Sequence, residues 1–278
     1  MVRVVVVGAG VNGVGSALAL QRLHPECQIT IIAKDFTPNT TGDGAAGLWE
    51  PYRKGTGDTP DSKILEWAGV TWQQFSEWYS KGEGKTRGLS LIHGTTLNSV
   101  LKPSPSWQHI PLGYASLTPD QCAQFGPRYK SGSRFTTFTA EPSKLLPSLL
   151  RDLKALGTRL EVRCLSSLKE AADEADLVIN CSGLGARDLV PDPLVFPVRG
   201  QVIRSAEVVE EWVGLRPYRS KGVRLEADEL QLGNRTIPVV HNYGHGGCGV
   251  TLSWGCSQEV ARLASRLILR HHGHASKL

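Results

Sequence analysis

The chain has few of the patterns that mark secreted, metal-binding or membrane proteins. Its six cysteines form no Cys-x-x-Cys pair and no metal-ligand spacing with histidine, which favours free thiols in a reducing compartment and predicts no metal site. No apolar run is long enough to span a membrane. The net charge of +5 is spread along the chain, which suits small acidic ligands. We therefore expect neither a nucleic-acid partner nor a membrane.

What the chain does have is a strong opening motif. Four valines, residues 4–7, predict a strand buried on both faces of a parallel sheet. The strand leads into Gly8-x-Gly10-x-x-Gly13, and an Ala- and Leu-rich helix follows over residues 17–23. This order is typical of a dinucleotide-binding turn, in which a pyrophosphate lies at the helix N-terminus. The alternative, a tight turn that binds no ligand, is disfavoured by the strand and helix on either side.

The second strand should carry a residue that binds a ribose. Residues 28–32 predict this strand, and an acidic side chain near its end commonly binds the ribose hydroxyls. The candidates are Lys34 and Asp35, of which Asp35 lies 22 residues beyond Gly13. An ordinary surface turn explains Asp35 equally well.

Two later segments repeat the pattern of a strand followed by a turn of small residues. Residues 176–185 (DLVINCSGLG) predict a buried strand that ends in such a turn. Residues 239–251 predict another strand and a glycine turn, and a helix follows over 257–269. Because the carboxyl ends of parallel strands share one edge, we expect the first and last glycine turns to converge on one ligand.

Several motifs together resemble the family of D-amino acid oxidases and D-aspartate oxidases. The most specific are VVHNYGHGGCGVTLSWG, residues 239–255, and GLRPYR, residues 214–219. GAGVNG, TTGDGAAGLWEPY, NCSGLGA and PVRGQV are similar to that family in the same order along the chain. The resemblance covers almost the whole sequence.

This resemblance implies an α/β fold, in which a Rossmann-type FAD-binding domain is interleaved with a mixed-sheet substrate domain that is truncated here. The FAD-binding part is expected at about residues 1–52, 143–190 and 239–270, and the substrate part at about 53–142 and 191–238. The implied cofactor is FAD. The implied reaction oxidises a D-amino acid to an imino acid, which hydrolyses to a 2-oxo acid and ammonia, while oxygen reoxidises the flavin and becomes hydrogen peroxide.

The resemblance also assigns roles to residues. Arg216 would clamp the substrate carboxylate, the carbonyl of Gly247 would receive the ammonium group, and Tyr52 would line the site. His241 and His245 would be structural, because the reaction needs no histidine base. The positions implied to contact FAD are Gly8, Ala9, Gly10, Val11, Asn12, Gly13, Lys34, Asp35, Thr40, Thr41, Ala46, Gly47, Leu48, Leu165, Ser182, Gly246, Gly247, Cys248, Gly249, Val250 and Thr251.

The chain departs from the family's pattern at two places. The acidic ribose position falls on Lys34, and a family threonine is replaced by Gly42. Between Gln201 and Arg216 the family has several dozen more residues, which carry the active-site lid and its two tyrosines. Without a lid, we expect substrate binding to suffer more than FAD binding.

Three interpretations follow from these departures. The leading one is an FAD-dependent D-amino acid oxidase with a truncated substrate domain. The second is a catalytically impaired FAD-binding remnant that lacks the lid, and the third is a different flavin enzyme such as an amine dehydrogenase. GLWEPY favours the branch that acts on neutral D-amino acids, whereas VGLRPYR and FPVRGQV favour the D-aspartate branch.

The tripeptide Ser276-Lys277-Leu278 matches the address read by the peroxisomal import receptor. It predicts a peroxisomal location. Whether the chain forms a homodimer stays open.

Overall fold

The structure is a computed structural model that describes residues 1–52, 55–200 and 214–275. Its main sheet has six strands in the order β10-β11-β7-β1-β2-β6. Five of them are parallel, and β10 pairs antiparallel with β11 at one edge. The bounds are β1 (Arg3–Val7), β2 (Gln28–Ala33), β6 (Arg159–Val162), β7 (Leu177–Asn180), β10 (Arg224–Leu232) and β11 (Arg235–Tyr243).

Strand β1 lies near the centre of this sheet, between β2 and β7. Successive side chains of a strand point to opposite faces, so Val4 and Val6 join one apolar cluster and Val5 and Val7 join another. All four valines are buried. The prediction of a strand buried on both faces is confirmed.

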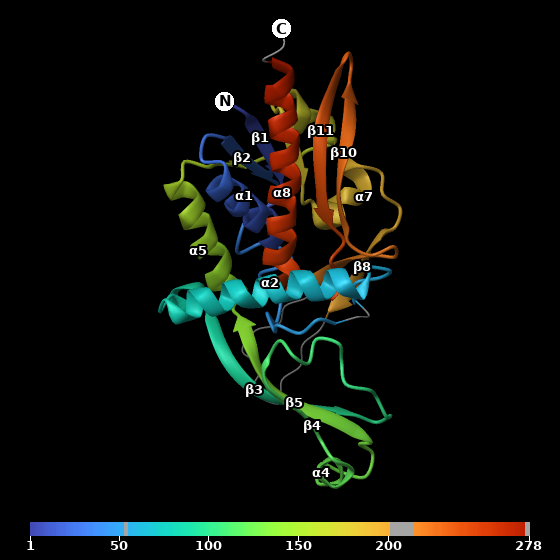
Figure 1. Cartoon of the computed structure of the whole chain (residues 1–278). Coiled ribbons are helices and arrows are strands. Elements are labelled where there is room, and N and C mark those ends of the chain that lie inside the picture. The colour runs from blue at the N-terminus through green and yellow to red at the C-terminus, as the bar shows by residue number, and fades with distance from the viewer. Residues whose placement is uncertain (53–54, 201–213, 276–278) are drawn as a thin grey trace.

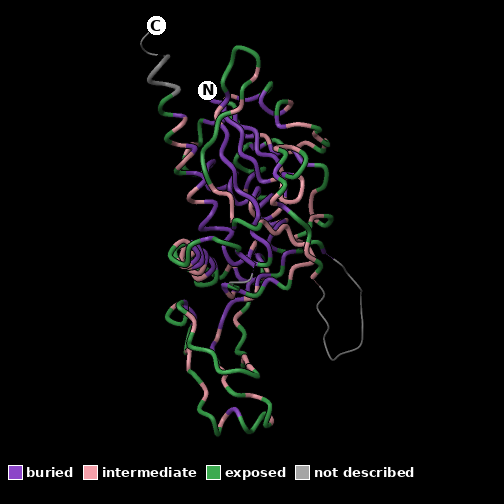
Figure 2. The backbone as a smooth tube through the Cα atoms, turned by 90° about the vertical axis from the view of Figure 1, so that its right-hand side faces the viewer, coloured by how far each residue is buried: buried purple, intermediate pink, exposed green. Residues whose placement is uncertain are grey.

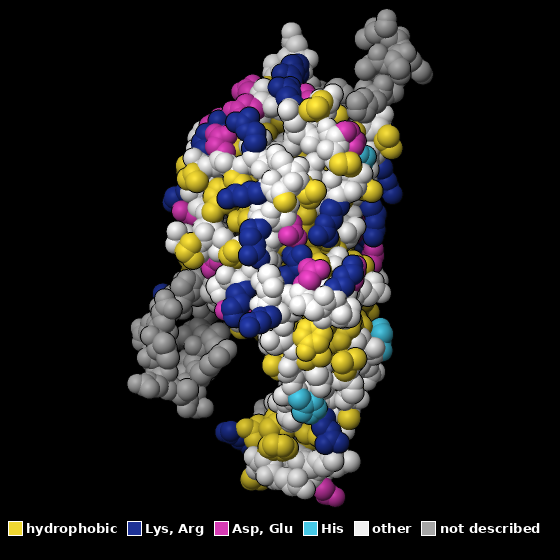
Figure 3. Space-filling model, turned by 90° about the vertical axis from the view of Figure 1, so that its left-hand side faces the viewer, with side chains coloured by type: hydrophobic (Ala, Val, Ile, Leu, Met, Phe, Trp, Pro, Cys, Tyr) yellow, Lys and Arg dark blue, Asp and Glu magenta, His cyan; other side chains and the backbone are white. Residues whose placement is uncertain are grey.

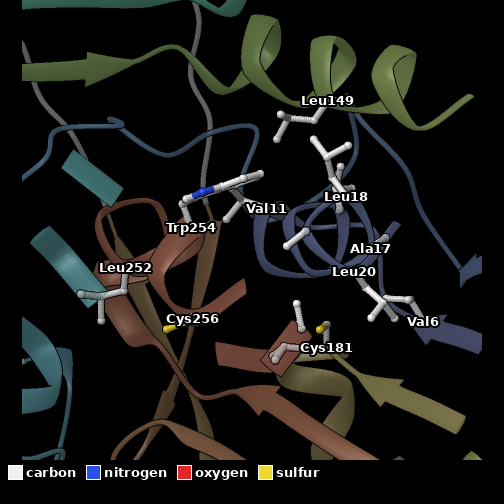
Figure 4. Close-up of a cluster of buried hydrophobic side chains, with 14 of the residues drawn as sticks. Val6, Val11, Ala17, Leu18, Leu20, Leu149, Cys181, Leu252, Trp254 and Cys256 are labelled. Carbon is white, nitrogen blue, oxygen red and sulfur yellow. The ribbon is translucent and has the colours of Figure 1, made fainter. Parts of the chain in front are cut away.

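Three helices cover the face of β1 that carries Val4 and Val6 (Figure 1). They are α1 (Val11–Leu23), α5 (Pro142–Ala155) and α8 (Gly249–Ala275). Figure 4 shows side chains of these helices, among them Leu18, Leu149 and Trp254, gathered above the strand. A β-carbon on Gly15 of α1 would lie 2.6 Å from the Ser257 hydroxyl of α8, so this glycine lets the two helices approach closely.

A second lobe lies below the main sheet (Figure 1). The long helix α2 (Asp61–Ser80) crosses between the lobes, and beneath it β3, β5 and β4 form an antiparallel sheet in that order. Figure 2 shows that backbone burial is concentrated in the upper lobe and that most of the lower lobe is exposed or intermediate. The bounds are β3 (Leu89–Asn98), β4 (Leu112–Ser116), β5 (Ser131–Ala140), α3 (Gly84–Arg87) and α4 (Pro119–Ala123).

An antiparallel pair of strands, β8 (Val195–Gly200) and β9 (Gly214–Arg219), completes the wall beside the main sheet. The remaining elements are α6 (Leu168–Asp173), α7 (Ala186–Leu189) and the 3₁₀ turns η2 (Gly183–Gly185) and η3 (Gly246–Cys248). Residues 224–238, which the sequence analysis places in the substrate part, lie in the same six-stranded sheet as β1.

The surface carries both signs of charge. Figure 3 shows Lys and Arg interspersed with Asp and Glu over the upper lobe, whereas hydrophobic side chains gather on the lower lobe. In the described part of the chain, no helix is both long and apolar enough to cross a bilayer.

Candidate active site

A cavity of about 840 Å³ opens along the carboxyl ends of the parallel strands. Residues from the ends of β1, β2, β6 and β7 line it, together with the glycine turn between β11 and α8. The carboxyl edge of such a sheet is where α/β proteins bind their ligands. The convergence of the first and last glycine turns that the sequence predicts is therefore present in the structure.

The turn after β1 is built for close approach. A β-carbon on Gly13 would overlap the carbonyl oxygen of Gly8, and Gly8 itself has a φ of +106°. The space in front of Gly10 is open, since no atom lies within 4 Å of where its β-carbon would be. The chain therefore packs tightly behind the turn and leaves open space before it, which is what a bound pyrophosphate needs.

Two helix N-termini face the cavity. Helix α1 begins after Gly10 with no side-chain cap and no acidic residue in its first turn, and α8 begins at Gly249. Free N–H groups at a helix N-terminus attract negative charge. Both termini contribute lining residues, so the cavity suits a ligand that is anionic at two places.

Asn12 and His245 join these two turns. The side-chain amide of Asn12 lies 3.2 Å from Nδ1 of His245. Asn12 Oδ1 and His245 Nε2 are buried, and neither has a hydrogen-bond partner among the described residues. Burial lowers the pKa of His245 to about 4, so the ring is neutral at pH 7. Because buried polar atoms are normally paired, these two atoms indicate hydrogen bonds to a ligand.

These features fit FAD. The cavity is long enough to be lined by both glycine turns, the first turn admits a pyrophosphate, and two buried polar atoms await partners. Gly47 also lines the cavity, and its φ of +66° and the nearby Ala140 carbonyl leave no room for a side chain there.

At the cavity end formed by β9, Arg216 presents an uncompensated positive charge. No ion pair or hydrogen bond holds its guanidinium within the part of the chain that the structure describes. Gly200 lies diagonally from it in the β8–β9 pair, and a β-carbon on Gly200 would lie 2.5 Å from Arg216 Nε. The glycine thus leaves room for the guanidinium, whose planar N–H groups can bind a carboxylate in a bidentate manner.

Gly247 lies where three side chains converge. A β-carbon there would be 3.7 Å from Arg216 Nη1, 3.8 Å from Tyr52 Cδ1 and 3.4 Å from the Tyr218 hydroxyl. Cys248 ties Tyr52 to this turn, since its Sγ donates to the Tyr52 carbonyl at 3.2 Å and accepts from the Tyr52 amide. A small molecule bound by Arg216 would therefore contact Tyr52 and Gly247 at once.

All but two of the residues implied by the resemblance line the cavity. The residues that line it are Gly8, Ala9, Gly10, Val11, Asn12, Lys34, Asp35, Thr40, Thr41, Ala46, Gly47, Leu48, Tyr52, Leu165, Ser182, Arg216, Gly246, Gly247, Gly249, Val250 and Thr251. Gly13 lies behind the turn against Gly8, and Cys248 is buried behind Tyr52. Lys34 and Asp35 are both exposed at the cavity edge, so the structure offers each of them to a ribose.

Other lining residues escaped the sequence analysis. Arg163 follows β6, Asp188 lies in α7, and Glu50 stands between Leu48 and Tyr52. The signal for Arg163 was available, because it comes directly after a parallel strand whose carboxyl end faces the site. Burial raises the pKa of Glu50, which marks it as a carboxyl group without a compensating charge.

The segment between Gln201 and Arg216, where the sequence analysis expects a missing lid, falls mostly outside the described residues. Of this segment the structure describes only residues 214–216, and Gly214 pairs with Gly200 in the β8–β9 pair. The Ser276-Lys277-Leu278 tripeptide also lies outside them.

Comparisons with known proteins agree with this geometry. The family model named DAO, FAD dependent oxidoreductase, matches residues 3–208. The chain is 32% identical to D-aspartate oxidase of Homo sapiens, over 96% of this chain and 95% of that one. It is 33% identical to D-amino-acid oxidase of Rubrobacter xylanophilus, over 94% of this chain and 95% of that one.

The human alignment extends over 329 positions, whereas this chain has 278 residues. At least 51 positions of that alignment (329 minus 278) are therefore occupied by the relative alone, which agrees with a shortened chain. Among solved structures, glycine oxidase of Geobacillus kaustophilus has a similar fold, with a TM-score of 0.69 at 15% identity, covering 96% of this chain and 95% of that one. The chain is an oxidoreductase that belongs to the DAO family of FAD-dependent enzymes.

Proposed function

We propose that the protein catalyses the oxidative deamination of D-amino acids to 2-oxo acids, ammonia and hydrogen peroxide. The observation that carries this proposal is the unpaired Arg216 guanidinium beside Gly247 and Tyr52, at the end of a cavity that fits FAD. Two curated relatives of the chain are named for oxidation of D-aspartate and of D-amino acids, which supports the same assignment.

The chain's own residues would bind and orient the substrate. Arg216 holds the α-carboxylate, and the Gly247 carbonyl accepts a hydrogen bond from the α-ammonium group. With both groups fixed, the α-hydrogen is directed to one side, which is how the site would select the D-enantiomer. Holding reactants in a productive geometry is the main contribution a protein makes to such a reaction.

Bound FAD supplies the two-electron acceptor, and its reoxidation by oxygen yields hydrogen peroxide. The first turn of α8, Gly249 to Thr251, presents backbone N–H groups to the cavity. These groups are suited to stabilise negative charge on a reduced ring system. The imino acid that leaves the site hydrolyses in water.

The test is flavin reduction without oxygen. FAD-loaded protein is mixed anaerobically with D-alanine, D-aspartate and the matching L-enantiomers, and the visible flavin bands are followed. The proposal predicts bleaching with D-amino acids only. Arg216→Met should keep the flavin bands and lower kcat/KM by about 100-fold or more, because the carboxylate is no longer positioned.

A second candidate is an FAD-binding protein that has lost oxidase activity together with part of its substrate domain. The observation that favours it is the length difference of at least 51 positions from the human relative (329 minus 278). Flavin bands that stay oxidised with a broad panel of D-amino acids would establish this candidate and exclude the first.

We also propose that Ser276-Lys277-Leu278 directs the protein to peroxisomes. A fluorescent protein that ends with residues 267–278 should collect in peroxisomes, and one that ends with Ser276→Asp in the same segment should stay diffuse.

A further inference from the structure

Residues 48–52 form an extended segment along the cavity wall. Trp49 and Pro51 are buried, whereas Leu48, Glu50 and Tyr52 line the cavity. This is the alternation expected of an extended chain, whose successive side chains point to opposite sides. Glu50 therefore directs its carboxyl group into the cavity, between Leu48 and Tyr52.

The backbone of this segment is fixed on both sides. Trp49 donates its amide to the Phe138 carbonyl at 2.9 Å, and Thr137 donates its hydroxyl to the Trp49 carbonyl at 2.7 Å. On the other side, the Thr251 hydroxyl lies 3.3 Å from both the amide and the carbonyl of Glu50. The direction of the Glu50 side chain is thus set by two neighbouring elements, β5 and α8.

The Glu50 carboxyl group has no partner of its own. No hydrogen bond or ion pair engages it within residues 1–52, 55–200 and 214–275. Glu50 is half-buried, and burial raises its pKa. The other acidic residues that line the cavity, Asp35 and Asp188, are exposed. A half-buried carboxyl group without a partner gains most from a ligand that brings a positive charge.

Glu50 and Arg216 lie near the same end of the cavity. A β-carbon on Gly247 would lie 3.7 Å from Arg216 Nη1 and 3.8 Å from Tyr52 Cδ1. The backbone of Glu50 is bonded to Thr251, four residues beyond Gly247. Cys248 is bonded to the backbone of Tyr52, which is two residues from Glu50. A substrate whose carboxylate is held by Arg216 can therefore extend its side chain along the wall that carries Glu50.

We propose that Glu50 is a side-chain subsite that selects D-amino acids with a cationic side chain, such as D-lysine and D-arginine. This inference rests on the proposed oxidase function, because Glu50 would bind the side-chain end of the same substrate whose carboxylate Arg216 binds. An ammonium or guanidinium group would pair with the carboxylate, whereas the side-chain carboxylate of D-aspartate would meet a like charge.

The first experiment compares substrates of matched size. D-Norleucine has the carbon chain of D-lysine without the terminal amine, so the ratio of their kcat/KM values isolates the charge. We expect D-lysine to be preferred by about tenfold or more in the FAD-loaded protein. Glu50→Gln should bring the ratio close to one, while Asp173→Asn, an equal loss of charge on the exposed end of α6, should keep it.

The second experiment measures binding without turnover. 6-Aminohexanoate and hexanoate are D-lysine and D-norleucine without the α-amino group, so neither can be oxidised. Calorimetry on the FAD-loaded protein gives their dissociation constants. We expect 6-aminohexanoate to bind about tenfold more tightly, and Glu50→Gln to abolish the difference. Equal binding of the two acids, or a preference that survives Glu50→Gln, would overturn the assignment of Glu50.

The two proposals fail in different ways. A preference for 6-aminohexanoate that Glu50→Gln removes, in a protein whose flavin no D-amino acid reduces, would reject the oxidase and keep the cation subsite. Oxidation of D-norleucine and D-lysine at equal rates would keep the oxidase and reject the subsite.

Discussion

The upper lobe with the six-stranded sheet (the cofactor lobe below) and the lower lobe with β3, β5 and β4 (the substrate lobe below) use β-sheet in opposite ways. In the cofactor lobe, every residue of β1 except Arg3 is buried. Helices α1, α5 and α8 cover one face of this strand, and α6 covers the other. In the substrate lobe, Leu89 is the one buried residue of the ten in β3. That lobe depends on an aromatic cluster at its root, where Trp72 and Phe75 of α2 pack on Phe138 of β5. The central strand of the cofactor lobe is thus buried by that lobe's own helices, whereas the substrate lobe obtains its buried aromatic contacts from α2.

The largest effect is expected where β9 is joined to β11 of the six-stranded sheet. Asp192 bonds Arg219 of β9 at 2.8 Å and the hydroxyl of Tyr243 of β11 at 2.9 Å, and it is buried. Burial would raise the Asp192 pKa, but these two hydrogen bonds and a backbone amide lower it overall. Asp192→Ala leaves Arg219 without its partner, so we expect a loss of about 3–5 kcal/mol in the free energy of unfolding.

Urea unfolding measures this loss, and Tyr243→Phe is the control. The control removes two hydrogen bonds, the one that the Tyr243 hydroxyl donates to Asp192 and the one that it accepts from Arg224, and leaves the Asp192–Arg219 ion pair. It should therefore cost about 2 kcal/mol. If the two variants lose the same free energy of unfolding, then the Asp192–Arg219 ion pair contributes nothing beyond the hydrogen bonds of Tyr243.

The next effect lies within the cofactor lobe and separates folding from FAD binding. A β-carbon at Gly13 overlaps the Gly8 carbonyl, whereas one at Gly10 meets no atom within 4 Å. We expect Gly13→Ala to destabilise the protein by about 1–3 kcal/mol through overpacking. Gly10→Ala should keep the thermal midpoint of the FAD-free protein and weaken FAD binding, because its methyl group occupies the space before the turn.

Thermal melts and flavin absorbance after gel filtration distinguish the two glycine variants. If Gly10→Ala binds FAD as tightly as the unchanged protein, then the space before the turn is not where the pyrophosphate lies.

A smaller effect is a pH dependence in the cofactor lobe. Burial lowers the pKa values of His241 and His245 to about 4, against 6.5 in an ordinary site. Between these values the unfolded chain binds more protons than the folded one. Stability should therefore fall as the pH drops from 6.5 toward 4, by up to about 1.4 kcal/mol per pH unit for each histidine.

Urea unfolding between pH 7 and pH 4.5 measures this slope. His245→Gln cannot titrate in this range and should reduce the slope by about half. A slope that is unchanged in this variant would assign the pH dependence to other groups.

The smallest effect is expected on the substrate lobe. Ile92 in β3 is 41% exposed, so Ile92→Thr keeps a β-branched side chain and removes little buried area. We expect the free energy of unfolding to change by no more than about 0.5 kcal/mol. A loss above about 1 kcal/mol, together with a lower mass in light scattering, would show that this face is covered by a second copy of the chain.

The sequence predicts the cofactor lobe well because its signals are local. The predicted strands 4–7 and 28–32 agree with β1 and β2 within a residue. Helix α1 begins at Val11, earlier than the predicted residue 17, because Gly13 and Gly15 are inside the helix. Glycine lowers helix propensity, but here the close packing of α1 requires it.

What the sequence does not predict depends on partners far away in the chain. Strand β10 carries four charged residues in nine and pairs at the sheet edge, so it shows no apolar alternation. The direction of Glu50 depends on hydrogen bonds to residues 137, 138 and 251. Asp192 meets Arg219 only after β8 and β9 have paired. In each case the determining contact lies outside any local window.

The packing of α1 against α8 has a consequence for biosynthesis. A ribosome makes β1 and α1 well before Gly247 and the first turn of α8. Until then the apolar side of α1 that α8 covers stays exposed, and the part of the cavity wall that residues 242–251 form does not exist. The complete cavity therefore forms only after α8 has been made, and until then the exposed apolar side of α1 makes the unfinished chain prone to aggregation.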